Sequence, residues 1–437
     1  MERTYAKNVK EKVGQTVLIK GWVHTIRDQG SIKFLLVRDI SGIVQTVAFK
    51  DNPEAFELIE KLSLESVVEI EGEAKAENHA PGGTEVGIKT IKVLSMAPPE
   101  IPIPVVEKTE AETELQKRLD WRWVDLRKPK NALVFKVWTE MEHAFRQYCV
   151  SSGFIEIHSP KITVCATESG SELFEIKYFD KKAYLVQSPQ LYKQMAMASG
   201  FEKVFEVGPV FRANPSFTSR HDTEFTMYDI EMSFIESHYE LMAEEEKMIV
   251  AMLTAIKEKY GEEIQNSYGR EVVIPKLSFP RITIAEAKKI LATMGISNER
   301  GGDLSPEEER GLSTYAMKEF GHEFIFVHDF PANVRAFYSM RLESDPMISK
   351  SFDLLWNGLE ITSGAQREHR PEQLEKQIAE KGLNVESFKD YLAFFKYGCP
   401  PHGGFAPGPT RMLMKIFGVS NVREVTFIYR GVNRLTP

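Results

Sequence analysis

Cysteine is scarce in this chain, and the cysteines that occur are far apart. Cys149, Cys165 and Cys399 form no paired spacing among 437 residues, so neither a disulfide framework nor a cysteine-based zinc site fits them. No apolar run reaches the roughly 18 residues that a membrane helix needs. The first dozen residues carry charges where a signal peptide would need an apolar stretch. We therefore expect a cytoplasmic protein that does not enter a membrane.

The chain also lacks an excess of positive charge. Its 55 Lys and Arg residues are outnumbered by 63 Asp and Glu residues, and the net charge is −8. A non-specific nucleic-acid binder would carry a broad basic surface, so any binding of nucleic acid has to rest on the fold and on local residues.

The N-terminal part has the pattern of a small β-rich domain. Three strand-like segments (VLIKGWVHTIRD, IKFLLVRD and IVQTVAF) precede a helix that begins at Pro53, and two more strands (VVEIEGEAKA and VGIKTIKVLSM) follow. This is the element order of the five-stranded OB barrel, a common binder of nucleic acids and oligosaccharides. An unrelated small barrel is the alternative.

A proline-rich segment separates this region from the rest of the chain. The sequence APPEIPIP ends at Pro104 and disfavours both helix and sheet, which predicts a stiff connector. A length of 437 residues already predicts more than one domain. We expect a first domain over residues 1–104, a linker over 105–130 and a second domain over 131–437. Alternating strands and helices without an internal repeat predict that the second domain is of the α+β class.

A long helix is predicted from Asn131. It has an apolar face that belongs either to the core or to an oligomer surface and is formed by Phe135, Trp138, Met141, Phe145 and Tyr148.

Two further strands, one ending near Arg212 and one starting near Glu224, flank the loop NPSFTSRHDT. The two-residue repeat of a strand places Tyr228 on a core face, and it places Phe225, Met227, Asp229 and Glu231 on the other face. Arg212, Arg220 and His221 cluster around the loop, and guanidinium groups suit phosphate oxygens. The pattern therefore indicates a site for a nucleotide polyphosphate, although an arginine-rich loop is also common as a solvated turn.

The segment SFDLLWNGLEITSG predicts a hairpin with a two-residue turn at Asn357 and Gly358. In the resulting register Asp353 opposes Thr362, and Asp353 and Glu360 share one face of the sheet. Carboxylates so close favour a cation between them, which points to Mg²⁺ bound with nucleotide phosphates. The alternative is a solvent-facing acidic pair.

Glycines in PPHGGFAPGPTR precede a predicted helix, RMLMKIFG, and would let the backbone or Arg411 approach a ligand closely.

Together these segments resemble the class II aminoacyl-tRNA synthetases over essentially the whole chain. The helix leading into FIEIHSP resembles motif 1, the FRA…TSRH…TEF hairpin resembles motif 2, and GPGPTR resembles motif 3. Within the class, QSPQLYKQ, ATESGSELF, ITSGAQREHR and YGCPPHGGF resemble the aspartyl enzyme of archaeal type. The resemblance implies an α+β fold in which an N-terminal five-stranded OB barrel binds the anticodon. A catalytic domain with a mainly antiparallel sheet flanked by helices would follow.

The resemblance also implies an activity, namely ATP-dependent activation of L-aspartate and its transfer to tRNA(Asp), with Mg²⁺ as cofactor and a homodimer as the assembly. Catalytic roles would fall to Arg212, Glu360 and Arg411. Aspartate would be bound by Glu168, Gln190, Lys193, Arg212, Asp229, Ser363 and Arg367. ATP would be bound by Arg212, Asn214, Arg220, His221, Asp222, Phe225, Glu360, Gly408 and Arg411, with Arg411 and Phe225 on opposite sides of adenine. The metal ligands would be Asp353, Glu360 and Ser363.

Two positions depart from the family's pattern. Asn214 stands where Glu commonly follows FRA, which puts contacts to the tRNA acceptor end in doubt. Pro409 and Thr410 replace the apolar and acidic residues usual in motif 3, but Arg411 is kept.

In the predicted barrel, Phe34 could stack on an anticodon base, and Arg27 and Gln45 could bond base edges. Family members that discriminate between tRNAs place Trp after GWV and Lys in the loop between the last two strands. This chain has His24 and Pro81 at those places, which predicts that tRNA(Asn) is also a substrate.

Rival interpretations remain. An asparaginyl enzyme would share the fold, but an ammonium at Lys193 suits a carboxylate better than an amide. A paralogue with a non-tRNA product, or a non-catalytic tRNA-binding module, is a more distant alternative. The OB pattern opposes the first of these, and Arg212, Glu360 and Arg411 oppose the second.

Overall fold

The computed structural model describes residues 1–106, 112–164, 172–297 and 302–437. It divides into two compact units, Met1–Ala132 and Leu133–Pro437, which are described separately below. Among the described residues, no helix is long and apolar enough to cross a membrane.

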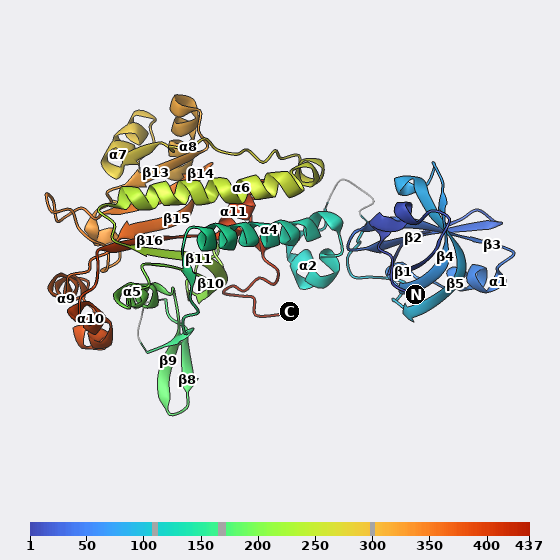
Figure 1. Ribbon diagram of the computed structural model, residues 1–437, viewed down its shortest axis with the longest axis horizontal. Coiled ribbons are helices and arrows are strands. Elements are labelled where there is room, and N and C mark those ends of the chain that lie inside the picture. Colours follow the sequence, from blue (N-terminus) through green and yellow to red (C-terminus); the bar gives the residue numbers. More distant parts are fainter. Residues whose placement is uncertain (107–111, 165–171, 298–301) are drawn as a thin grey trace. The chain divides into compact units, whose positions relative to one another are not determined.

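The first unit contains the predicted OB barrel (Figure 1). Its strands close in the order β1-β2-β3-β5-β4. Asn52 caps the single α-helix between β3 and β4 by accepting a bond from the backbone of Ala55, and Pro53 occupies its first turn. The elements are η1 (Ala6–Lys12), β1 (Thr16–Asp28), β2 (Ile32–Asp39), β3 (Gly42–Phe49), α1 (Pro53–Glu60), β4 (Val67–Ala76), η2 (Pro81–Gly83) and β5 (Thr84–Ser95).

The segment predicted as a linker contains two short helices, α2 (Leu115–Asp120) and α3 (Arg122–Asp125). They are tied together by the fully buried carboxylate of Asp125, which lies 3.1 Å from Arg118 Nε and 2.7 Å from an Arg122 nitrogen. The side-chain amide of Asn131 donates to the same carboxylate at 2.9 Å. These ion pairs stabilise helical structure in a segment for which the sequence pattern predicted only a linker.

The second unit is built on an eight-stranded sheet in the order β12-β13-β14-β15-β16-β11-β10-β6. The β12–β13 and β10–β6 pairs are parallel and the other pairs are antiparallel, as expected for a mainly antiparallel sheet. Its strands are β6 (Ile155–Glu156), β10 (Lys203–Phe211), β11 (Glu224–Ser233), β12 (Arg281–Thr283), β13 (Phe324–His328), β14 (Ser351–Trp356), β15 (Leu359–Gln366) and β16 (His402–Pro407). A small second sheet contains β7 (Ile162–Thr163), β8 (Glu175–Tyr178) and β9 (Lys181–Leu185).

Helices cover this sheet. They are α4 (Pro129–Ser151), which begins in the first unit, α5 (Gln190–Ala198), α6 (His238–Tyr268), α7 (Ile284–Thr293), α8 (Pro306–Phe320), η3 (Ala332–Val334), α9 (Pro371–Glu380), η4 (Val385–Phe388), α10 (Lys389–Lys396), α11 (Pro409–Phe417) and α12 (Val422–Val425).

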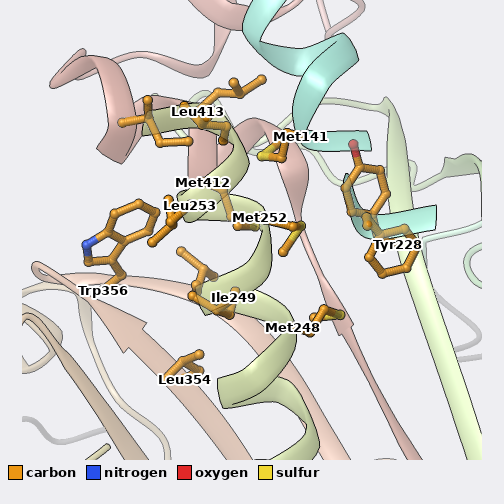
Figure 2. Packing of buried hydrophobic residues seen from close by; sticks show 14 of the residues in the cluster. Met141, Tyr228, Met248, Ile249, Met252, Leu253, Leu354, Trp356, Met412 and Leu413 are labelled. Carbon is orange, nitrogen blue, oxygen red and sulfur yellow. The ribbon is translucent and has the colours of Figure 1, made fainter. Parts of the chain in front are cut away.

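The main core lies between the sheet and the long helices α4 and α6. Met248 and Met252 of α6 pack there with Met141 of α4, Tyr228 of β11 and Leu354 of β14 (Figure 2). Side chains alternate along β13, so Phe326 joins this core, whereas Ile325 and Val327 pack with α7 and α8 on the other face.

The apolar face of α4 is therefore mainly core. Met141 and Phe145 are fully buried, and Phe135, Trp138 and Tyr148 pack against the same cluster while remaining partly exposed. Of the two interpretations left open by the sequence, the core accounts for most of this face.

Glu245 of α6 is a buried carboxyl group within this unit. Its side chain is fully buried, and neither carboxylate oxygen has a hydrogen-bond partner among the described residues. Burial raises the pKa of Glu245 to about 8. The nearby Thr362 hydroxyl opposes this shift, and the charges of Glu246 and Asp353 add to it.

We expect Glu245→Gln to flatten the pH dependence of stability. Between the unfolded pKa of 4.5 and the folded value of about 8, the folded chain holds a proton that the unfolded chain releases, so wild-type stability falls as the pH rises. At about 1.4 kcal/mol for each pH unit, the variant should gain on the order of 2–3 kcal/mol over wild type between pH 5 and pH 7.5. Urea unfolding at both pH values measures this difference. Glu258→Gln, at an exposed position of the same helix, is the control, and equal pH slopes in all three proteins would contradict the assignment.

Candidate functional site

A cavity of about 380 Å³ in the second unit collects nearly all of the predicted ligand-binding residues. Those that line it are Gln190, Lys193, Arg212, Asn214, Arg220, His221, Asp222, Phe225, Asp229, Glu360, Ser363, Arg367, Gly408 and Arg411. Asp353 lines a neighbouring cavity of about 780 Å³, which shares Asn214, Arg220, His221 and Glu360 with the first. Glu168 lies outside the described residues.

The β10–β11 hairpin forms one wall of the cavity. Its register runs from Lys203 opposite Met232 to Phe211 opposite Glu224. Tyr228 and Ile230 point into the main core, and Phe225, Met227 and Asp229 line the cavity, as the two-residue repeat predicted.

Arg212 presents its guanidinium to the cavity without a carboxylate partner among the described residues. It lies 5.3 Å from the ring centre of Phe225, and Nε donates to the carbonyl of Gln187 at 3.4 Å. An arginine so placed is available for an anionic ligand. The structure thus brings Arg212 close to the Phe225 ring.

Arg220 is held by a residue that sequence analysis did not assign. One of its terminal nitrogens lies 2.9 and 2.7 Å from the two carboxylate oxygens of Glu309, on α8. Glu309 also accepts the backbone N–H of Glu360 at 3.0 Å, so it joins the motif 2 loop to β15. Glu309 is far from the loop in the sequence. The only sequence signal at this residue is the run of glutamates in the first turn of α8.

Two groups beside Arg220 have shifted pKa values. Burial, together with the charges of Arg411 and Arg220, lowers the pKa of His221 to about 4, so this imidazole is neutral at pH 7. Burial raises the pKa of Asp222 to about 7.

Arg411 lies near the start of α11, whose N-cap is Gly408. One of its nitrogens donates to the backbone carbonyl of Glu360 at 2.8 Å and lies 3.4 Å from the Glu360 carboxylate. Motif 3 therefore positions Glu360 through the main chain as well as through charge.

At the inner end of the cavity, two cations meet two carboxylates. Lys193 Nζ lies 3.0 Å from Asp229 and 3.4 Å from Glu231, and Arg367 Nε lies 3.0 Å from Glu231. The side-chain amide of Gln190 donates to Glu231 at 3.5 Å. All four charged side chains are at least nine-tenths buried. Sequence analysis placed Glu231 on this face of the strand but did not identify it as the partner of both cations.

The two carboxylates differ in their pKa values. Burial raises the pKa of Asp229, although Lys193 opposes this shift. Burial also acts on Glu231, but Arg367 and Lys193 outweigh it and lower the pKa of Glu231. Glu231 is therefore a stable anion that orients both cations.

Gly404 of β16 is required by this cluster. A Cβ atom at position 404 would lie 2.3 Å from a Glu231 carboxylate oxygen and 2.0 Å from the carbonyl of Ile230. The sequence suggested that glycines in this segment let a ligand approach the backbone. In the structure, Gly404 instead leaves space for a buried carboxylate beside the strand.

The β14–β15 hairpin has the predicted turn but not the predicted register. Asn357 and Gly358 have positive φ angles of 45° and 80°. A β-bulge at Ile361 shifts the pairing, so Asp353 opposes Ser363 and the predicted pairing with Thr362 is wrong. The bulge inserts one residue that a strict two-residue repeat cannot anticipate.

The cation beside Asp353 in the structure is the guanidinium of Arg335. It donates to both Asp353 oxygens at 2.9 and 2.6 Å and to the Ser363 hydroxyl at 3.2 Å. Burial nevertheless raises the pKa of Asp353 to about 6, with Glu360 adding to the shift and Arg335 opposing it. Sequence analysis missed Arg335 because it comes from a loop between β13 and β14.

Of the two carboxylates, Glu360 is better placed than Asp353 to bind a Mg²⁺ ion. Mg²⁺ is commonly held by one or two carboxylates together with substrate phosphates. The Glu360 carboxylate is partly exposed in the cavity, whereas Arg335 binds both oxygens of Asp353. The positive charge of Arg335 beside Asp353 competes with a metal ion for that carboxylate.

The predicted anticodon residues lie on one face of the OB barrel. Arg27 of β1 is the cross-strand partner of Phe34 of β2, and Gln45 of β3 is the partner of Leu36. Leu36 is two residues after Phe34 on the same strand, so all of these side chains lie on one face. Arg27 is exposed and Phe34 is partly exposed. Gln45 is buried, and its amide donates to Glu85 at 3.0 Å.

His24 and Pro81 occupy different settings in the same unit. His24 lies at an irregularity of the β1–β2 register, and its Nδ1 is 3.2 Å from an Arg38 nitrogen. Arg38 is itself paired with Glu65 at 2.7 Å. Pro81 is exposed and begins the short helix η2 between β4 and β5.

Comparison with known proteins agrees with this geometry. Residues 114–429 match the family described as tRNA synthetases class II (D, K and N), and residues 17–94 match the OB-fold nucleic acid binding domain. An aspartate–tRNA(Asp) ligase of Pyrococcus abyssi is 43% identical over 436 residues, covering 99% of each chain. An aspartate–tRNA(Asp/Asn) ligase of Methanopyrus kandleri is 44% identical, covering 98% of this chain and 97% of that relative.

Among solved structures, asparaginyl-tRNA synthetase from Pyrococcus horikoshii complexed with asparaginyl-adenylate is similar at a TM-score of 0.91. It is 34% identical, with each chain covered completely. The family match spans most of the chain, and the curated relatives match at full length. The chain belongs to the class II tRNA synthetases of the D, K and N group.

Proposed function

We propose that the chain is an aspartate–tRNA ligase, which activates L-aspartate with ATP and transfers it to tRNA(Asp). The observation that carries this proposal is the buried cation pair, Lys193 and Arg367, at the inner end of the cavity. The cavity lining has six cationic side chains and four carboxylates, a balance that suits anionic substrates. The names of the full-length relatives support the same activity.

In the first step, the α-carboxylate of aspartate attacks the α-phosphorus of ATP, and pyrophosphate leaves. No protein nucleophile is needed, because positioning and charge neutralisation supply the catalysis. Arg212 would hold the α-phosphate, and Arg220 and neutral His221 would contact the outer phosphates. Lys193 and Arg367 would face the side-chain carboxylate of aspartate, and Asp229 its ammonium group.

Magnesium bound with the nucleotide would be held by Glu360, with Ser363 and Asp353 beside it, and would neutralise phosphate charge. Arg411 would keep Glu360 in place through its bond to the backbone carbonyl.

In the second step, a hydroxyl of the terminal ribose of tRNA attacks the aspartyl carbonyl, and AMP leaves. The OB barrel would bind the anticodon through Arg27, Phe34 and Gln45. Base stacking and base-edge hydrogen bonds are how such barrels bind single-stranded loops.

The alternative is an asparaginyl-tRNA synthetase, because the Pyrococcus horikoshii enzyme shares the fold, but its 34% identity is lower than the 43% of the Pyrococcus abyssi aspartate–tRNA(Asp) ligase. Exchange of pyrophosphate into ATP, measured with each amino acid in turn, separates the two. Exchange that depends on aspartate supports the proposal, and exchange that depends on asparagine alone overturns it.

We expect tRNA(Asn) to be charged with aspartate within about tenfold of tRNA(Asp). His24 is held beside Arg38 and Pro81 is short and rigid, so neither offers the large stacking surface or the Lys donor of discriminating family members. Losing such contacts weakens discrimination by about 1–3 kcal/mol. Charging of the two purified transcripts side by side measures the ratio. A preference for tRNA(Asp) above about a hundredfold, roughly 2.7 kcal/mol, would reject relaxed choice.

We expect a homodimer in solution. A groove of about 710 Å³ runs along α4, where partly exposed Phe135 and Trp138 lie beside exposed Phe427. A second copy of the chain, packed across these aromatic side chains, would cover them. Light scattering should give about twice the chain mass of 49.8 kDa. A stable active monomer would contradict the expectation, and Phe427→Asp should shift the mass towards one chain.

A further inference from the structure

Three side chains with metal-binding atoms converge on the α6 side of the sheet, away from the substrate cavity. His238 is the first residue of α6, His328 is the last residue of β13, and Asp329 follows it directly. His328 pairs with Phe352 on β14, whereas Val327 pairs with Asp353. Because side chains alternate along a strand, His328 points towards the α6 core and Asp353 towards the other face. The cluster is thus separate from the site described above.

The backbone at Asp329 is arranged so that two successive residues face the same point. In a regular strand, His328 and Asp329 would point to opposite faces. Asp329 instead has a φ angle of +61°, a left-handed conformation that non-glycine residues adopt at some cost. This turn brings its carboxylate back to the His328 side, within 3.1 Å of Nδ1.

The ligand atoms are close together and poorly satisfied. Asp329 Oδ1 lies 3.2 Å from His238 Nε2 and Asp329 Oδ2 lies 3.1 Å from His328 Nδ1, and one ligand atom from each of the three residues lies within 4.8 Å of the others. His238 and His328 are only 3% and 5% exposed. Although these contacts are short, their geometry does not meet that of a hydrogen bond. Among the described residues, neither ring nitrogen of His238 nor Nδ1 of His328 therefore has a hydrogen-bond partner. Buried imidazole nitrogens without partners are costly, which calls for a ligand that accepts their lone pairs.

Their spacing suits a metal ion. Zinc–nitrogen and zinc–oxygen bonds of about 2.0–2.1 Å in a tetrahedral site place neighbouring ligand atoms roughly 3.3 Å apart. We propose that His238, His328 and Asp329 bind one divalent transition-metal ion of the Zn²⁺ type. Two imidazole nitrogens and one carboxylate favour such an ion over Mg²⁺, which prefers oxygen ligands alone.

The surroundings permit this site. The Asp329 side chain is 19% exposed, which leaves a route for the ion and a position for water as a fourth ligand. The nearby cation Arg281 is already paired with Glu246 at 2.7 Å, so its charge is compensated. A bound ion would join the beginning of α6 to the end of β13, two elements of the catalytic unit that sequence separates by more than eighty residues.

The test is titration of the full-length chain, stripped of metal, with Co²⁺ and Zn²⁺ in excess Mg²⁺. We expect one Co²⁺ per chain with visible absorption bands typical of nitrogen ligands, and a rise in Tm on adding Zn²⁺. Asp329→Asn and His328→Ala should each weaken binding by at least about a hundredfold and abolish the rise in Tm. Asn also tolerates the left-handed conformation, so the first variant keeps the backbone. His79→Ala, which removes an exposed imidazole between β4 and η2, is the matched control and should bind as wild type does.

Each result decides the matter. One ion per chain that is lost in both variants and kept in the control supports the site. No binding to the wild-type chain, or binding that either variant retains, overturns it, because the cluster is then a histidine–aspartate ion pair alone. Weakening in the His79 control to the same degree also overturns it, since the ion would then be bound at the surface.

Discussion

Glu360→Gln is expected to lower aspartate-dependent exchange of pyrophosphate into ATP by about a thousandfold. The substitution removes one negative charge but keeps the shape of the side chain. The backbone bonds of residue 360, from its N–H to Glu309 and from Arg411 to its carbonyl, do not depend on the carboxylate and should persist. The loss would therefore report the charge that holds magnesium beside the phosphates.

The control for this experiment is Glu375→Gln, at an exposed position of α9, which should leave exchange unchanged. Unfolding curves of the two variants should match, because neither substitution alters a buried contact. If Glu360→Gln exchanged pyrophosphate within a few-fold of wild type, Glu360 would not be a metal ligand, and Asp353 would then be the carboxylate left to bind the ion.

Features specified by local sequence were predictable. The Asn357–Gly358 turn, the alternation that buries Tyr228 and turns Asp229 towards the cavity, and the succession of strands and helix along the OB-barrel segment all follow from short-range rules. These rules fix which side chains share a face, but most residues of the candidate site were assigned by the resemblance to the class II synthetases, and the structure brings nearly all of these to one cavity.

Features that depend on residues distant in the sequence were not predictable. Arg335 binds Asp353, Glu309 binds Arg220, and Glu231 sits between two cations. Each partner comes from another element, and a charged residue has the same appearance in sequence whether it is solvated or buried in an ion pair. The bulge at Ile361 is similar, since no turn residue or proline marks it.

Lys193→Met is expected to reduce the preference for aspartate over asparagine, measured as the ratio of their kcat/KM values in exchange, by on the order of a hundred- to a thousandfold. Lys193 is 1% exposed and lines the cavity, so water screens its ammonium charge only weakly from an aspartate carboxylate that binds there. Asparagine offers no charge to that ammonium, so the wild-type chain discriminates against the amide by several kcal/mol. Met fills a similar volume without the charge, which removes this discrimination.

The ratio matters because Lys193 also neutralises Asp229 and Glu231. Removing it leaves two buried carboxylates with less compensation, and a loss of about 3–5 kcal/mol in stability is expected as well. A purely structural role would lower activity with both amino acids equally and leave their ratio unchanged, since both are measured on the same folded fraction. Lys203→Met, at a half-buried position at the start of β10, should leave the ratio unaltered. An unchanged ratio in Lys193→Met would show that Lys193 only supports Glu231, and Arg367 would then be the group that selects aspartate.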